Sequence, residues 1–146
     1  MQIRLAEFDE LKKLSRLMLE IFHLKMKEKY TSEVQTSFLK EMALGSLQKR
    51  YFQDNLFYIS VEDEEIKGVL ELERPCHIAF LLVKEERKGI ARALCSHALR
   101  KTEEEFCTVG AFKDAIEFYK KLDFQILSKK DIKSNIPYTL MAKVLY

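Results

Sequence analysis

One stretch of the chain, residues 77–94, does most to limit what the chain can fold into. It begins with His77–Val83, an almost unbroken apolar run of strand length, which is typical of a strand covered on both faces. The charged run 84–88 follows, then Gly89, and from Ile90 onward apolar residues recur at helical spacing. A strand that leads through a glycine turn into a helix brings unpaired N–H groups and the positive end of the helix dipole to one place. The pattern therefore predicts an anion site, and the basic residues beside it are Arg87, Lys88 and Arg92.

Two other interpretations of this stretch stay open at this point. The first is an ordinary strand-to-helix connection with a solvated basic loop. The second is an unrelated phosphate-binding α/β protein that binds ATP or GTP. The second is disfavoured, because the stretch holds no GxGxxG pattern and the pair Lys88–Gly89 does not belong to the GK[ST] sequence of a P-loop.

A second stretch, residues 109–124, reads VGAFKDAIEFYKKLDF. Together the two stretches resemble the GNAT superfamily of N-acetyltransferases. The family's cofactor loop, (Q/R)-x-x-G-x-(G/A), aligns with residues 86–91, where Gly89 and Ala91 match and Glu86 departs. The loop is also shorter than in common relatives.

The second stretch resembles the family pattern V-N-A-x-x-x-A-x-x-F-Y-x-x-L-G-F. Gly110 stands in place of the Asn and Asp123 in place of the last Gly. The run Ile136-Pro137-Tyr138 with Met141 resembles the last strand of small bacterial members. The matching positions are Val109, Ala111, Ala115, Phe118, Tyr119, Leu122 and Phe124.

The resemblance implies a single α/β domain over residues 1–146, with a mixed, mostly antiparallel sheet of about seven strands and about four helices on both faces. It implies acetyl-CoA as cofactor, CoA as product, no metal, and direct transfer of acetyl to a primary amine on a small molecule or peptide. The cofactor contacts that it implies are Leu81, Leu82, Val83, Arg87, Lys88, Gly89, Ile90, Ala91, Arg92, Gly110, Ala111, Ala115 and Phe118. A non-catalytic relative that binds acyl-CoA as a sensor or interaction module is the alternative, favoured by Glu86 and the short loop.

By the same resemblance, Tyr119 is the general acid that protonates the leaving thiolate. A tyrosine with a pKa near about 10 is protonated at neutral pH, and general acid catalysis accelerates a reaction by about 10²–10⁴-fold. The competing interpretation is a core tyrosine packed beside Phe118. The base is left open between Glu71, Glu73, His77 and a water chain. The acceptor wall implied by the resemblance includes His23, Met26 and Tyr30.

Composition limits the class of protein further. A chain of 146 residues with 47% hydrophobic residues is expected to bury one core. A net charge of +2, with both signs interspersed, argues against a nucleic-acid or membrane partner. Three cysteines without a CxxC pattern indicate reduced thiols in a cytoplasmic protein, and a thiol enzyme is disfavoured. The sequence shows no secretory leader or membrane span, and a homodimer through a sheet edge is possible.

Periodicity and turn residues predict the individual elements. Asp9 is expected to cap the first helix, and Asp114 with Glu117 to form a capping box. The predicted helices include 32–50 and 89–105, and a loop is predicted over 129–135. The predicted strands are residues 1–6, 56–61, 66–73, 77–83, 106–111, 124–127 and 138–145.

Overall fold

The computed structural model describes residues 1–86, 88–133 and 136–145, and these form one seven-stranded sheet in the order β1-β2-β3-β4-β5-β7-β6. Neighbouring strands are antiparallel except β4 and β5, which are parallel. The strands are β1 (Gln2–Leu5), β2 (Leu56–Glu62), β3 (Glu65–Glu73), β4 (His77–Val83), β5 (Phe106–Ala111), β6 (Gln125–Lys133) and β7 (Ile136–Val144). The α-helices are α1 (Leu11–Ile21), α2 (Ser32–Met42), α3 (Leu44–Phe52), α4 (Ile90–Lys101) and α5 (Ile116–Lys121).

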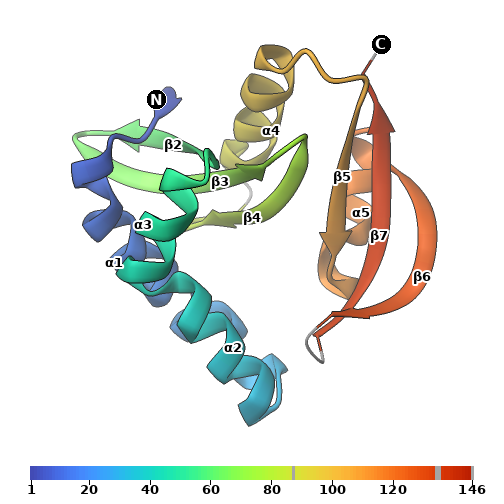
Figure 1. Cartoon of the computed structure of the whole chain (residues 1–146), viewed down its shortest axis with the longest axis horizontal. Coiled ribbons are helices and arrows are strands. Elements are labelled where there is room, and N and C mark those ends of the chain that lie inside the picture. Colours follow the sequence, from blue (N-terminus) through green and yellow to red (C-terminus); the bar gives the residue numbers. More distant parts are fainter. Residues whose placement is uncertain (87, 134–135, 146) are drawn as a thin grey trace.

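Helices cover both faces of the sheet (Figure 1). On one face, α1, α2 and α3 bury an apolar cluster that includes Leu14, Met18 and Phe38 against β2 and β3. On the other face, Leu94 of α4 and Tyr119 of α5 belong to a second buried cluster with residues of β3, β5 and β7. The predicted fold class, a mixed and mostly antiparallel sheet between helices, is confirmed.

The predicted single helix over 32–50 is wrong, because the chain breaks at Ala43. Ala43 is extended, with φ −65° and ψ 147°, and serves as the C-cap of α2 and the N-cap of α3. Carbonyl groups freed by the break are bonded by side chains: Ser15 Oγ donates to Met42 O at 2.7 Å, and Ser46 Oγ donates to Lys40 O at 2.7 Å. Tertiary hydrogen bonds therefore stabilise a turn that the apolar periodicity does not show.

The predicted helix over 89–105 is too long at its C-terminal end. α4 ends at Lys101, and Thr102 is extended with φ −85° and ψ 150°. Its hydroxyl accepts a hydrogen bond from the backbone N–H of Glu104 at 3.2 Å. The helix thus ends on basic residues, and the acidic residues 103–105, which would oppose the dipole, lie outside it.

The predicted loop over 129–135 is wrong for the residues that the structure describes there. Residues 129–133 continue β6, which pairs with β7 through Ile132↔Pro137 and Lys133↔Ile136; residues 134–135 lie outside the described part of the chain. β6 is an edge strand, and polar, lysine-rich sequences are common at sheet edges. Because an edge strand needs no apolar alternation on its outer side, its sequence resembles a loop.

Two predicted helix caps are also wrong. Asp9 lies inside a 3-10 turn, Phe8–Glu10, that precedes α1, and the capping box there is formed by Glu7 and Glu10. Asp114 lies in another 3-10 turn, Lys113–Ala115, before α5, where Ala115 is the cap residue and makes no side-chain cap hydrogen bond. The carboxylate of Asp114 is instead paired with Lys29 Nζ at 2.7 Å.

Candidate active site

The strands β4 and β5 separate from each other at the middle of the sheet. They pair only through His77↔Thr108 and Ile78↔Val109, and beyond these residues they diverge (Figure 1). A bulge in the pairing with β3 leaves Ala79 without a partner residue, because Leu72 pairs with Ile78 and Glu71 with Phe80. Bulges bend a strand and are frequent beside active sites. After Ile78, the backbone groups on the side of β4 that faces β5 therefore have no partner in the described pairing between these two strands.

A cavity of about 540 Å³ occupies this opening. Its lining comes from the two diverging strands, from α2 and α3, and from the start of α5. An apolar concave site with a few polar groups is the usual form of a small-molecule site. The lining includes His77–Leu82 of β4, 109–111 of β5, Tyr119 of α5 and Tyr138 of β7.

The glycine turn that the sequence singles out lies at the N-terminus of α4. Gly89 is the N-cap residue with φ 76°, a conformation that favours glycine, and a Cβ built there would meet nothing within 4 Å. The helix is held close to β3 at Gly68, where an added Cβ would come within 3.0 Å of Ile90 and 3.2 Å of Leu94. The first N–H groups of α4 have no partner within the helix, and with open space beside Gly89 they suit a phosphate group. Together with the free backbone of β4, they fit the extended chain and pyrophosphate of coenzyme A.

The departure of Glu86 from the family pattern is balanced by a lysine from the first half of the chain. Lys25 Nζ donates to Val83 O at 2.9 Å and lies 3.8 Å from the Glu86 carboxylate. Lys25 lies in a π-helical turn, Phe22–Met26, and turns of this kind are frequent at functional sites. Nothing local to Lys25 in the sequence indicates its contact with the loop after β4, so this lysine is not among the predicted site residues. Arg87, predicted to contact the cofactor, lies outside the described residues.

Tyr119 lines the cavity and is only 5% exposed. Its ring packs edge-on against Phe118 and Phe124, with centroids 5.1 and 5.3 Å away. Burial raises the pKa of Tyr119 well above its usual value of 10.0, so the phenol stays protonated at neutral pH. Within the described part of the chain, no group forms a hydrogen bond to its hydroxyl. The phenol is therefore held in place by its ring and has a proton to give.

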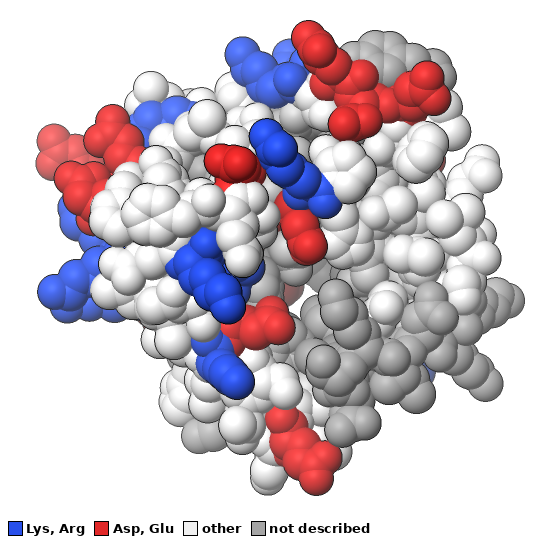
Figure 2. Space-filling model, in the orientation of Figure 1, with Lys and Arg blue, Asp and Glu red and all other residues white. Residues whose placement is uncertain are grey.

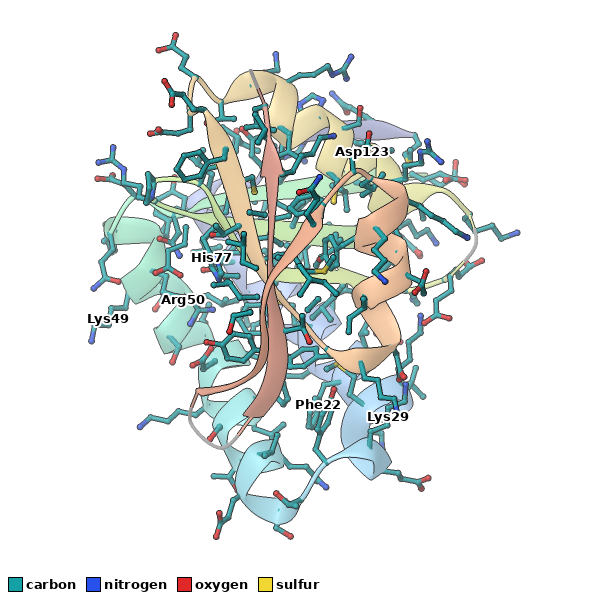
Figure 3. All side chains as sticks on the ribbon, turned by 90° about the vertical axis from the view of Figure 1, so that its right-hand side faces the viewer. Phe22, Lys29, Lys49, Arg50, His77 and Asp123 are labelled. Atoms are coloured by element: carbon teal, nitrogen blue, oxygen red, sulfur yellow. The ribbon has the colours of Figure 1, made fainter. Side chains whose placement is uncertain are left out.

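The structure does not support Glu71 as the base. Its side chain is fully buried and accepts from Arg50 Nε at 2.7 Å, from Arg50 Nη2 at 3.1 Å and from Asn55 Nδ2 at 2.7 Å. This cluster fastens the end of α3 to β3 and occupies the carboxylate. Sequence reasoning missed Arg50 and Asn55, because their partner is remote in the chain. In Figure 3, Arg50 and His77 lie in the same region of the molecule.

His77 lies on β4 directly opposite Glu73 of β3, and both residues line the cavity. Its ring atom Nδ1 is 2.8 Å from Thr108 Oγ1, across the parallel pairing with β5. This contact fixes the orientation of the imidazole. Of the base candidates, His77 and Glu73 are the side chains that both border the cavity and lie where β4 and β5 begin to part.

The predicted acceptor wall is placed only in part. Met26 and Tyr30 line the cavity, whereas His23 is exposed and is not among its lining residues. Tyr30 packs against Phe38 and Phe112, with ring centroids 5.5 and 5.7 Å away, and both rings also line the cavity. This aromatic wall joins α2 to the loop after β5, which only the tertiary fold brings together.

The remaining predicted cofactor residues fall into two groups. Leu81, Leu82, Gly110, Ala111 and Ala115 line the cavity. Outside it are Val83, Lys88, Gly89, Ile90 and Ala91 of the loop and helix start, Arg92, which borders a second cavity beside α5, and Phe118, which packs on Tyr119.

The absence of a side chain at Gly110 leaves room for the ring of Tyr138. A Cβ at this position would lie 2.8 Å from Cδ2 of Tyr138, so the ring of Tyr138 fills the space that the family's asparagine would need.

Two features are absent from the residues that the structure describes. None of their helices is long and apolar enough to cross a membrane. They hold no group of three or more His, Cys, Asp or Glu side chains arranged to bind a metal ion.

Comparison with known proteins agrees with this geometry. Residues 26–145 match the family model described as the acetyltransferase (GNAT) domain. The chain therefore belongs to the GNAT acetyltransferase family. Comparison of the sequence with curated proteins gives no significant match.

Solved structures show the same fold at low sequence identity. A GCN5-related N-acetyltransferase from Rhodopseudomonas palustris superposes with a TM-score of 0.85 and 17% identity, over 98% of this chain and 94% of its own. The PaiA N-acetyltransferase from Thermoplasma acidophilum, solved with coenzyme A, superposes with a TM-score of 0.79 and 18% identity, over 99% of both chains. An aminoglycoside 6'-N-acetyltransferase complexed with coenzyme A superposes with a TM-score of 0.72 and 14% identity, over 100% of this chain and 98% of its own.

Proposed function

We propose that this protein is an N-acetyltransferase that moves the acetyl group of acetyl-CoA directly to a primary amine. The observation that carries the proposal is the opening between β4 and β5, where strand backbone and the phenol of Tyr119 border one cavity, while the N-terminus of α4 follows β4 outside the cavity lining. Two of the fold relatives named above were solved with coenzyme A, which supports the choice of cofactor. Acetyl-CoA supplies the activated thioester when it is bound.

In this proposal, acetyl-CoA is bound partly by backbone groups and partly by positive charge. The backbone groups of Ala79–Leu82 on the β5 side suit pairing with an extended amide chain, as one strand pairs with another. The first N–H groups of α4 bind phosphate oxygens, with Lys25 supplying positive charge from the side of β4. This division tolerates the unusual Glu86, because backbone donors do not depend on side-chain identity.

We assign the proton transfers to two side chains that line the cavity. The Tyr119 hydroxyl gives its proton to the leaving sulfur as the carbon–sulfur bond breaks, and burial keeps that proton in place at neutral pH. The imidazole of His77, oriented by Thr108, accepts the proton that the attacking nitrogen loses. The geometry requires no covalent acetyl-enzyme, since the cysteines that the structure describes, Cys76, Cys95 and Cys107, are buried and line no part of this cavity.

Binding and turnover need separate measurements. Isothermal titration calorimetry with acetyl-CoA, with ATP as the control ligand, tests the cofactor site. Mass spectrometry of a mixture of primary amines incubated with protein and acetyl-CoA then tests transfer, since each acetylated amine gains a known mass. Binding of acetyl-CoA together with acetylated amine supports the proposal. Cofactor binding without any acetylated amine would favour the non-catalytic acyl-CoA module, and no binding would contradict both.

A further inference from the structure

The charges that line the cavity between β4 and β5 do not cancel. Among its described lining residues, the charged side chains are Lys29, Glu41, Arg50, Glu73 and Asp114. Lys29 and Asp114 form an ion pair at 2.7 Å, and Arg50 is paired at 2.7 Å with the fully buried Glu71. Glu41 and Glu73 have no such partner in the part of the chain that the structure describes. Among the residues that the structure describes, the cavity wall therefore has two carboxylates without an ion-pair partner.

Neither cation of the lining is free to bind an anionic acceptor. Arg50 Nε and Nη2 already donate to Glu71 and to the backbone carbonyl of Glu41, and its charge is balanced by Glu71. Lys29 donates to Asp114 at 2.7 Å, a contact that raises the pKa of Lys29. An acceptor with a carboxylate would meet Glu41 and Glu73 with no unpaired cation among the described lining residues. Like charges in such a site lower affinity, so the lining disfavours this class of acceptor.

Aromatic rings complete the wall next to these carboxylates. Tyr30, Phe38 and Phe112 contact one another with centroids 5.5–5.7 Å apart, and all three line the cavity. The faces of such rings attract ammonium groups, and their edges and the neighbouring leucines accept methylene groups. Figure 2 shows acidic side chains beside the hollow that separates α2 and α3 from β5 and β7.

We infer that the acceptor is a dicationic aliphatic amine, with the reacting amine at one end of a methylene chain and a second ammonium group at the other. This inference rests on the proposed acetyl transfer at the same site. The reacting amine lies near His77 and Tyr119, and the second ammonium group binds Glu41 of α2 against the aromatic wall, with Glu73 adding negative charge beside His77. The methylene chain contacts the apolar lining between them.

Three acceptors of equal length test this assignment: 1,5-diaminopentane, n-pentylamine and 5-aminopentanoate, whose far ends are cationic, neutral and anionic. Shorter and longer diamines, each with its monoamine, cover other spacings. We expect kcat/KM for the best diamine to exceed that for its monoamine about tenfold, which equals about 1.4 kcal/mol, and the amino acid to be the poorest acceptor. The preference is expected to shrink as salt is raised, since exposed charges are screened.

Matched variants locate the effect. The double variant Glu41→Gln/Glu73→Gln is expected to bring the diamine-to-monoamine ratio of kcat/KM close to one. Glu33→Gln, an exposed change on the same helix α2 outside the cavity lining, is expected to leave the ratio unchanged. An unchanged ratio in the double variant overturns the inference.

Calorimetry with the protein saturated with CoA gives a readout that does not need turnover. We expect heat of binding from the diamine, weakened in the double variant, and less binding by the monoamine. Equal or better binding and turnover of the monoamine or the amino acid overturns the inference and leaves the proposed acetyl transfer standing. If acetyl-CoA binds but no amine is acetylated, the proposed transfer is contradicted, and the calorimetric comparison of the amines still decides the inference. If acetyl-CoA does not bind, the proposed transfer is contradicted, and the same comparison of the amines is made on the protein without CoA.

Discussion

The substitution Tyr119→Phe separates chemistry from folding more cleanly than any other change in this protein. The tyrosine is 5% exposed, and its ring contacts with Phe118 and Phe124 are retained by phenylalanine. Within the described residues its hydroxyl forms no hydrogen bond, so its removal leaves no partner group unsatisfied. We therefore expect the free energy of unfolding to change by less than about 1 kcal/mol.

The rate of acetyl transfer is expected to respond very differently. Loss of a general acid lowers a rate by about 10²–10⁴-fold, which corresponds to about 3–5 kcal/mol of transition-state stabilisation. Because burial raises the pKa of Tyr119 well above 10.0, the wild-type rate should show no loss from deprotonation of this phenol as the pH rises from neutral toward 10.0. The affinity for acetyl-CoA should stay the same, since the phenol acts on the leaving sulfur.

Three measurements on the variant test this reasoning: urea unfolding, calorimetry with acetyl-CoA, and single-turnover acetyl transfer. Tyr58→Phe is the matched control, because Tyr58 is also 5% exposed but lies outside the lining of the cavity. We expect it to transfer acetyl at the wild-type rate. A Tyr119→Phe protein that keeps its stability and cofactor affinity and turns over within threefold of wild type would refute the acid role.

Three further predictions concern the ion pairs. Arg50→Met leaves the buried Glu71 without its charged partner, so urea unfolding should show a loss of about 3–5 kcal/mol, and stability within 1 kcal/mol of wild type would contradict this. Glu86→Gln removes a negative charge near the phosphate site, so calorimetry should show acetyl-CoA binding a few-fold more tightly, most clearly at low salt; weaker binding would contradict the placement of the site. The hydrogen bond from Arg4 lowers the pKa of Glu10 to about 2, so this carboxylate stabilises the fold above its ordinary value of 4.5, and the stabilisation is lost as pH falls toward 2. Because the pair touches solvent, the difference in stability between wild type and Glu10→Gln should be only about 1 kcal/mol at pH 7 and should vanish near pH 2 in pH-dependent urea unfolding.

Local patterns in the sequence were sufficient for most of the elements. The bounds of β4 and β5 follow from apolar runs between charged or acidic stretches, and the start of α4 follows from Gly89 and the apolar spacing after it. The errors lie where a distant group decides the local structure. Ala43 breaks a helix whose freed carbonyl at Met42 is bonded by Ser15, and polar residues 129–133 form a strand because β7 pairs with them.

The candidate site shows the same division. Tyr119, Gly89 and the strand 77–83 are recognisable along the chain, because each lies in a contiguous motif whose spacing reflects one turn or one strand. Glu71 looks equally available in the sequence, but the fold buries it with Arg50 and Asn55. Lys25 reaches the cofactor loop across 58 positions of sequence, a contact that no local pattern can indicate.

The sequence by itself determined the family, the glycine turn at the start of α4 and the tyrosine that we propose as the general acid, because these depend on residues close together in the chain. The tertiary structure alone decided how far β4 and β5 separate, which carboxylates are already paired, and which remain uncompensated in the cavity. The physical reason is that the electrostatics of a site is a sum over groups brought together by folding. A charge that is unpaired in the sequence can be neutralised by a residue from another element, as Glu71 is by Arg50, or stay without an ion-pair partner among the described residues, as Glu41 and Glu73 do.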